Sequence, residues 1–175
     1  MRTPFFLFFI LLPAFVFGQR FQGNSNVSLS VNAGPAFGVS VKYENLFKDN
    51  FSYYAGLTFL RDTDEIESSG ELLTARFNDF FGEVGGRYYL SRYSKLLPFI
   101  GGGVFAGYEQ FFNSDIISGA IIYDRGDSYL YGAGAEAGVE YNMGKTSLLI
   151  SAQGKYDFSQ QHLYVLGSVG LNFYF

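Results

Sequence analysis

The chain has 175 residues, enough for one domain, and its 12 basic and 16 acidic residues give a formal net charge of −4. It has no cysteine, which excludes a disulfide framework and a thiolate metal site, and no basic block of the kind that binds nucleic acid. Its 22 glycines, 21 phenylalanines and 14 tyrosines are typical of many strands joined by tight turns.

The first residues, MRTPFFLFFILLPAFVFGQ, form a short apolar segment. Arg2 supplies a positive start, Phe5–Leu12 form the apolar centre, and the small residue Gly18 marks a cleavage site. We therefore predict a signal peptide over residues 1–18 and a mature barrel over residues 19–175. A membrane-anchor helix is the alternative, but the apolar run is shorter than the ~20 residues that a spanning helix needs.

Apolar and polar residues then alternate along the rest of the chain, which predicts strands with two different faces. In the first such segment Val27, Leu29 and Val31 alternate with Ser28 and Ser30. The predicted strands span residues 26–34, 37–44, 51–60, 75–90, 97–111, 129–142, 147–158 and 163–175.

An even number of strands, each of about ten residues with period two, is typical of an outer-membrane barrel. Alternation alone does not distinguish a soluble sandwich, whose apolar face is its core, from a membrane barrel, whose apolar face contacts lipid. Three features favour the membrane barrel: aromatic strand ends such as Tyr129, Tyr141 and Phe158, a polar face rich in glycine and serine, and export. We predict an all-β, eight-stranded antiparallel up-and-down transmembrane barrel, integral to the bacterial outer membrane. A periplasmic lipocalin-like barrel is the soluble alternative.

The connections between the predicted strands alternate in length. Short ones follow the second, fourth and sixth strands, whereas residues 61–73 and 113–128 form two long, acidic connections. This pattern places the short turns and both ends of the chain on the periplasmic side. The apolar cluster at residues 116–123 indicates either a docking surface for another protein or a hairpin that extends around Ser118–Gly119.

Ten charged residues fall on the polar faces and are predicted to point into the lumen. Eight strands enclose only enough space for side chains, so these charges must pair, and a salt-bridged plug is favoured over an ion or proton path. The predicted partners are Glu83, Glu109 or Glu136 for Arg87, and Glu140 or Asp157 for Lys155. The full set is Lys42, Glu44, Asp79, Glu83, Arg87, Glu109, Glu136, Glu140, Lys155 and Asp157.

The sequence LGSVGLNFYF ends in an alternating strand that stops on an aromatic residue, whereas a soluble domain commonly ends in a frayed polar tail. A terminal phenylalanine preceded by apolar residues at alternate positions resembles the signal by which the assembly machinery recognises outer-membrane barrels. The residues predicted to form this assembly signal are Val169, Leu171, Phe173 and Phe175.

Catalytic and cofactor motifs are sparse. The single histidine, His162, lies near Ser159 and Asp157 in the last outer connection, so a rim enzyme acting on lipid or lipopolysaccharide is one hypothesis. A lone loop histidine is usually only solvated, and the chain has no metal-ligand spacing, phosphate loop or calcium loop. We expect no enzymatic activity, no cofactor and no metal.

Five segments resemble, in order and spacing, the TraO family of conjugative-transposon proteins from Bacteroides-type bacteria. The segments are GEVGGRYYL (82–90), GGGVFAGYEQF (101–111), YLYGAGAEAGVEY (129–141), LLISAQGKYDF (148–158) and GSVGLNFYF (167–175). The most specific matches are Gly107-Tyr108-Glu109, Tyr131-Gly132-Ala133-Gly134 and Gln153-Gly154-Lys155.

This resemblance covers residues 72–175 and implies a small outer-membrane component of a DNA-transfer apparatus, without catalytic residues. It implies other conjugative-transfer proteins as partners, and the acidic balance argues against direct binding of nucleic acid. A barrel would also contact outer-membrane lipid and the barrel-assembly machinery. The alternative function is a general outer-membrane barrel that acts in envelope stability or adhesion through its outer loops.

Overall fold

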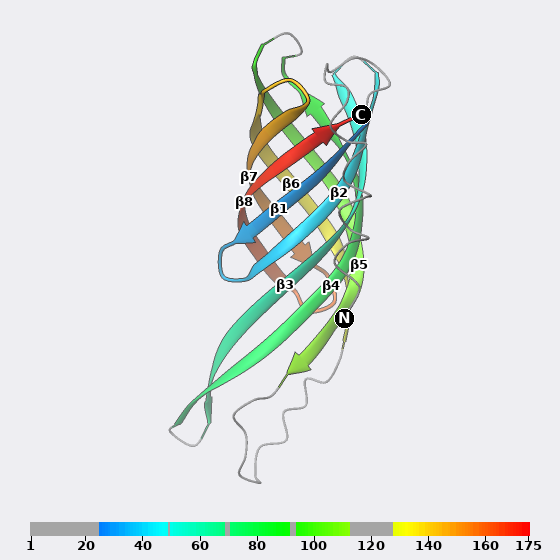
Figure 1. Cartoon of the computed structure of the whole chain (residues 1–175). Helices are drawn as coiled ribbons and strands as arrows, with labels where there is room; N and C mark the ends of the chain where they lie inside the picture. The colour runs from blue at the N-terminus through cyan, green and yellow to red at the C-terminus, as the bar shows by residue number, and fades with distance from the viewer. Residues whose placement is uncertain (1–24, 49, 69–70, 92–93, 113–127) are drawn as a thin grey trace, which may run out of the picture.

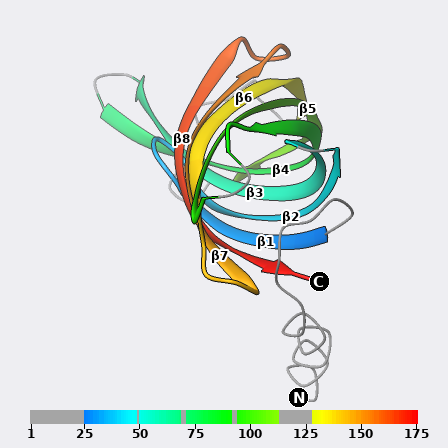
Figure 2. The same ribbon diagram turned by 90° about the horizontal axis from the view of Figure 1, so that it is seen from above.

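Eight antiparallel strands form a closed barrel in the computed structural model (Figure 1). The structure describes residues 25–48, 50–68, 71–91, 94–112 and 128–175. Each strand pairs with the next in the chain, and β1 pairs with β8 to complete the ring (Figure 2). The predicted fold class is confirmed. The strands are β1 (Ser25–Ala33), β2 (Phe37–Lys48), β3 (Phe51–Ser68), β4 (Glu71–Tyr89), β5 (Leu96–Phe112), β6 (Ser128–Asn142), β7 (Thr146–Asp157) and β8 (His162–Tyr174).

Side-chain exposure alternates along the strands with the predicted period. In β1, Leu29 is 40% exposed and Val31 47%, whereas Ser28 and Asn32 are each 1% exposed. The exterior of the ring is therefore apolar and the interior polar, which is the reverse of a water-soluble protein. Lipid covers such an exterior at no cost to the backbone, because a closed barrel leaves no strand edge unpaired. No helix among the described residues is long and apolar enough to cross a membrane.

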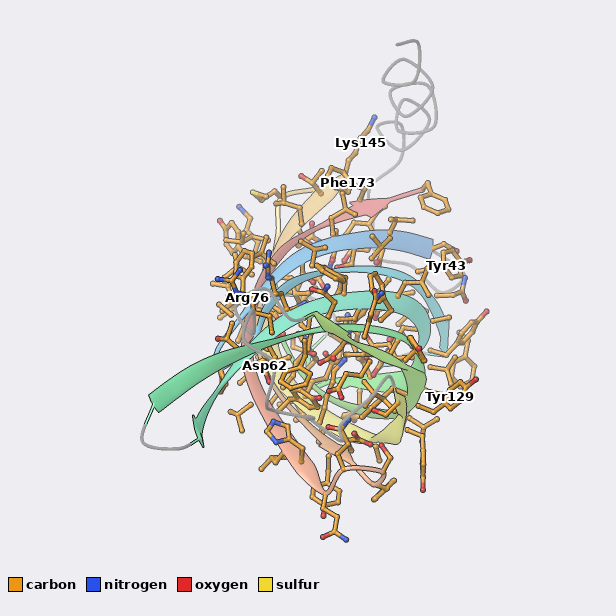
Figure 3. The ribbon with its side chains drawn as sticks, turned by 90° about the horizontal axis from the view of Figure 1, so that it is seen from below. Tyr43, Asp62, Arg76, Tyr129, Lys145 and Phe173 are labelled. Atoms are coloured by element: carbon orange, nitrogen blue, oxygen red, sulfur yellow. The ribbon has the colours of Figure 1, made fainter. Side chains whose placement is uncertain are left out.

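Aromatic side chains surround the exterior at both ends of the barrel. At the periplasmic end, the rings of Phe51 and Tyr88 lie 5.2 Å apart between centroids. At the other end, the rings of Tyr108 and Tyr129 lie 5.7 Å apart. Figure 3 shows Tyr43 and Tyr129 on the outside of the ring. Two aromatic girdles of this kind mark the two membrane–water interfaces of outer-membrane barrels.

The connections at the end where the chain terminates are short turns, as predicted. The β6–β7 turn requires a glycine, because Gly144 has φ +103° and its N–H donates to Oδ1 of Asn142 at 2.7 Å. The chain terminus lies at the same end, where the Phe175 N–H donates to the Ser25 carbonyl at 3.0 Å. By the usual orientation of such barrels this end faces the periplasm.

The prediction of a loop over residues 61–73 is wrong. β3 and β4 continue through this segment and stay paired from Phe51 opposite Tyr88 to Ser68 opposite Glu71. The resulting β3–β4 hairpin extends well beyond the rest of the barrel (Figure 1). Outside the membrane a strand needs no lipid-facing apolar residues, and the β3 part of this segment, DTDEIES (62–68), has only one apolar residue, Ile66, so its sequence has the composition of a loop. The apolar cluster at residues 116–123 and the predicted signal peptide over residues 1–18 lie outside the described residues.

Candidate functional site in the barrel lumen

The ten charged residues predicted for the lumen are all buried, and none is more than 7% exposed. They do not form one network, because a cluster of apolar residues separates those at the outer mouth from those in the middle. Six residues form a middle tier. They are Lys42, Glu44, Glu83, Arg87, Glu136 and Lys155.

Arg87 is the centre of the middle tier. Its Nε lies 2.5 Å from Oε1 of Glu136, and its Nη2 donates to Oε2 of the same carboxylate at 3.1 Å. Its Nη1 donates to Oε2 of Glu44 at 2.9 Å. A guanidinium fork matched to one carboxylate and bonded to a second is a strong, geometrically specific arrangement. Glu136 is one of the three partners predicted for Arg87.

Glu83 is the second centre of this tier, and its carboxylate forms ion pairs with two lysines. Lys155 Nζ lies 2.7 Å from its Oε2, and Lys42 Nζ lies 3.0 Å from its Oε1. Lys42 Nζ also lies 3.7 Å from Oε2 of Glu136, the carboxylate that binds Arg87, so Lys42 connects the ion pairs of Glu83 with those of Arg87. Lys155 therefore pairs with Glu83, which is not among the partners predicted for it. The tier holds three cations and three carboxylates, and its formal charge is balanced.

Inward-facing glycines allow these side chains to meet across an intervening strand. Gly101 of β5 lies opposite Arg87 of β4 on one side and opposite Glu136 of β6 on the other. A Cβ at Gly101 would lie 3.0 Å from both Cγ of Arg87 and Oε1 of Glu136. Gly56 of β3 lies in the same way between Lys42 and Glu83. The glycines therefore set which charged residues can reach one another.

The Gly101→Val variant is expected to destabilise the barrel by about 1–3 kcal/mol, because its branched side chain displaces Arg87 from Glu136. Gly154→Val is the matched control, since Gly154 lies on the outward face of β7 and an added Cβ there meets nothing within 4 Å. The measurement is the urea midpoint of the folded fraction. Equal midpoints for the two variants would contradict the role assigned to Gly101.

Aromatic rings line the middle tier, and they are not among the predicted site residues. Lys42 Nζ lies 4.7 Å from the centroid of the Tyr54 ring, and Lys155 Nζ lies 4.5 Å from that of Phe81. Tyr89 donates from its hydroxyl to Glu44 Oε1 at 2.7 Å. The signal that could have identified Tyr54 and Tyr89 is their position on the polar face, where a large aromatic residue needs a specific partner.

Side chains rather than water fill this part of the lumen. The cavity beside the ion pairs has a volume of about 10 Å³, which is room for about one water molecule. On the periplasmic side Tyr89, Leu97, Phe99 and Leu149 form an apolar cluster. On the outer side a larger cluster includes Leu60, Phe81, Phe105, Leu130 and Leu166. The arrangement is a plug of paired charges held between two apolar clusters.

The remaining four predicted lumen residues lie at the two ends. Asp79 and Glu109 are opposite each other at the outer mouth, where Glu109 accepts from Gln160 at 2.7 Å. Asp157 accepts there from the Ser159 hydroxyl at 2.7 Å. Glu140 lies at the periplasmic end and accepts from the hydroxyls of Ser147 and Tyr174. None of these four belongs to the middle tier.

The candidate rim residues are not arranged for nucleophilic catalysis. Ser159 donates its hydroxyl to Asp157. The ring of His162 packs edge-on against Tyr164, with centroids 4.6 Å apart. Among the described residues, no hydrogen bond joins the imidazole of His162 to the hydroxyl of Ser159, so these two side chains do not form a base–nucleophile pair. No group of three or more His, Asp and Glu side chains in the described ranges is placed to hold a metal ion.

The residues of the predicted assembly signal lie on the outward face of β8 and at the end of the chain. Val169 is 55% exposed, and Leu171 and Phe175 are also exposed on the lipid-facing wall. Phe173 is half-buried beside Val27 of β1. The strand that carries the signal is thus the one that closes the barrel. Its recognition by assembly machinery stays a prediction.

The barrel has the fold of several solved outer-membrane proteins. OprG of Pseudomonas aeruginosa matches with a TM-score of 0.60 at 11% identity, over 88% of this chain and 96% of that one. The N-terminal β-barrel domain of OprF from the same species matches with a TM-score of 0.57 at 14% identity, over 88% and 98%. Ail, the attachment invasion locus protein of Yersinia pestis, was solved in complex with the heparin analogue sucrose octasulfate. It matches with a TM-score of 0.55 at 15% identity, over 89% and 100%.

These likenesses are to the fold alone, since the identities are low. No family model matches the chain, and no curated protein matches its sequence. The shared fold is that of integral outer-membrane barrels, and the apolar exterior of this chain requires the same setting. The protein is therefore an integral barrel of the outer membrane.

Proposed function

We propose that this barrel is a non-enzymatic structural and interaction component of a conjugative DNA-transfer apparatus in the outer membrane. The observation that carries the proposal is the combination of a plugged lumen with a hairpin that extends beyond the membrane. A lumen filled by paired charges leaves the outer surface of the protein as the part that can act on other molecules. The resemblance of residues 72–175 to the TraO family supports the choice of apparatus.

The β3–β4 hairpin is suited to contacts with another protein. β2 pairs with β3 only as far as Arg61, and β5 pairs with β4 only from Arg76 onward. Within the described residues, neither neighbouring strand continues along the rest of the hairpin. The edge of β3 beyond Arg61 can therefore accept a strand from a partner. Other transfer proteins are the partners that the resemblance implies, and the net charge of −4 argues against DNA.

Shortening the hairpin tests this proposal. Removing residues 64–75 and joining Thr63 to Arg76, which are directly paired, through Asn-Gly keeps the register of the barrel. We expect donor cells that carry this variant to lose conjugative transfer to the level of a gene deletion, while the amount of folded barrel in the outer membrane is unchanged. Replacing only Ser69–Gly70 with Asn-Gly is the control. Normal transfer by cells that carry the shortened hairpin would contradict the proposal.

A general role in adhesion or envelope stability is the second candidate. The fold likeness to Ail, an attachment protein solved with a heparin analogue, favours it. Cells that carry the shortened hairpin also distinguish the two functions. Loss of attachment to host cells or of detergent resistance, with transfer intact, would favour this candidate, and transfer genes beside the coding sequence would favour the first.

A further inference from the structure

A groove crosses the lipid-facing wall of the barrel over β2, β3 and β4. Its volume is about 360 Å³, comparable with on the order of ten methylene-sized groups, and Val39, Val41, Leu57, Phe59, Phe80 and Gly82 line it. The hollow arises where Leu57 lies opposite Gly82, which contributes no side chain. A Cβ at Gly82 would meet Leu57 Cδ2 only at 3.8 Å, so the backbone leaves room there.

The outer end of the groove coincides with the change from apolar to polar residues on this wall. Phe59 and Phe80 are directly paired, and their ring centroids lie 4.8 Å apart. The next outward position on β3 is Arg61, which is exposed, opposite Asn78 on β4. The two phenylalanines therefore lie at the membrane–water boundary on the side opposite to the short turns.

Two arginines lie just above this boundary on the same face. Arg61 is opposite Asn78 and Arg76 is opposite Thr63, so the two arginines are diagonal neighbours, about 7–8 Å apart at the backbone. Among the described residues, no hydrogen bond or ion pair engages either guanidinium. Figure 3 shows Arg76 near the point where the hairpin leaves the ring.

We propose that this wall binds one phosphorylated lipid, with an acyl chain in the groove and its phosphate between Arg61 and Arg76. Guanidinium forks bind phosphate oxygens in pairs, and the apolar groove directly below accepts the chain that such a headgroup carries. The hairpin side faces outward, so the lipid at this level belongs to the outer leaflet. The occupant is therefore the phosphorylated glycolipid of that leaflet, lipid A, rather than a glycerophospholipid.

Native mass spectrometry of the full barrel in detergent, titrated with diphosphoryl lipid A, tests the proposal. We expect one lipid A per wild-type barrel, and binding weaker by at least about tenfold for the Arg61→Gln/Arg76→Gln variant. Gly82→Leu, which fills the groove, is expected to weaken binding as well. The controls are Lys95→Gln/Lys145→Gln at the opposite end and Gly154→Leu on the outward face of β7. A heat-modifiable gel band verifies that each variant is folded.

Three results would overturn the proposal. The first is wild-type affinity for lipid A in the Arg61→Gln/Arg76→Gln variant. The second is an equal loss in the Lys95→Gln/Lys145→Gln control, which would mean attraction by charge in general. The third is equal or tighter binding of phosphatidylglycerol, which would assign the groove to a glycerophospholipid. Lipid A binding that is weakened both by Arg61→Gln/Arg76→Gln and by Gly82→Leu, and kept in the controls, supports it.

Discussion

The Arg87→Met variant is expected to unfold at a markedly lower urea concentration than the wild type, with a loss of about 3–5 kcal/mol in the free energy of unfolding. Arg87 is 1% exposed and bonds to both Glu44 and Glu136. Removing the cation leaves two buried carboxylates without their main partner, next to a cavity that has room for about one water. The chain has no tryptophan, so the folded fraction is measured from the migration of unboiled samples on a gel.

Two further variants separate charge from packing. Arg87→Lys keeps the positive charge but loses the two-point contact with Glu136, so its urea midpoint is expected to lie between wild type and Arg87→Met. Adding Glu44→Gln to Arg87→Met leaves two cations and two carboxylates in the tier, because the ion pair of Glu44 is with Arg87, and is expected to recover most of the lost stability. A wild-type midpoint for Arg87→Met, or no recovery in the double variant, would contradict the charge account of the plug.

Deleting Phe175 is expected to abolish accumulation of the barrel in the outer membrane of cells while leaving its refolding in detergent close to that of the wild type. The side chain is 48% exposed and packs loosely against Tyr43, with ring centroids 6.4 Å apart. The side chain therefore adds little to the stability of the folded barrel, and the backbone hydrogen bonds with Ser25 that the deletion removes lie at the very end of the β1–β8 pairing. A large effect in cells then requires recognition of the chain end. The measurement is the amount of the protein in isolated outer membranes, by immunoblot.

Phe175→Tyr keeps a terminal aromatic residue and is expected to assemble normally. Phe175→Ser is expected to behave like the deletion. If the deletion accumulates at the wild-type level, the assembly signal is wrong. If the purified deletion variant also fails to refold in detergent, Phe175 is needed for folding itself, and its interpretation as an assembly signal is wrong.

The strands and their faces could be predicted from the sequence because lipid and lumen impose opposite chemistry on alternate residues. Val169 and Leu171 face lipid and Ser168 and Asn172 face the lumen, which follows from a period of two. The ten inward charges follow from the same pattern. The prediction fails where β3 extends beyond the membrane: after Arg61 its residues DTDEIES (62–68) include only one apolar side chain, Ile66, so the composition does not distinguish a strand from a loop.

The pairing of the charges could not be predicted, because it depends on which strands meet across the closed ring. Lys155 of β7 reaches Glu83 of β4, and these two strands are not neighbours. Arg87 reaches Glu136 over β5, which the glycine at 101 allows. Contacts between neighbouring strands can be predicted from the sequence once the register is known. Contacts across a lumen also depend on the curvature of the barrel and on which positions lack a side chain.

The most direct test of the central claim is heat-modifiable migration of the protein in isolated outer membranes. A closed barrel stays folded in detergent without boiling and migrates differently from the boiled chain. We predict a band in the outer-membrane fraction that shifts on boiling. A protein that fractionates as soluble, with no shift on boiling, would mean that the apolar faces form the core of a soluble domain, and it would contradict the membrane barrel.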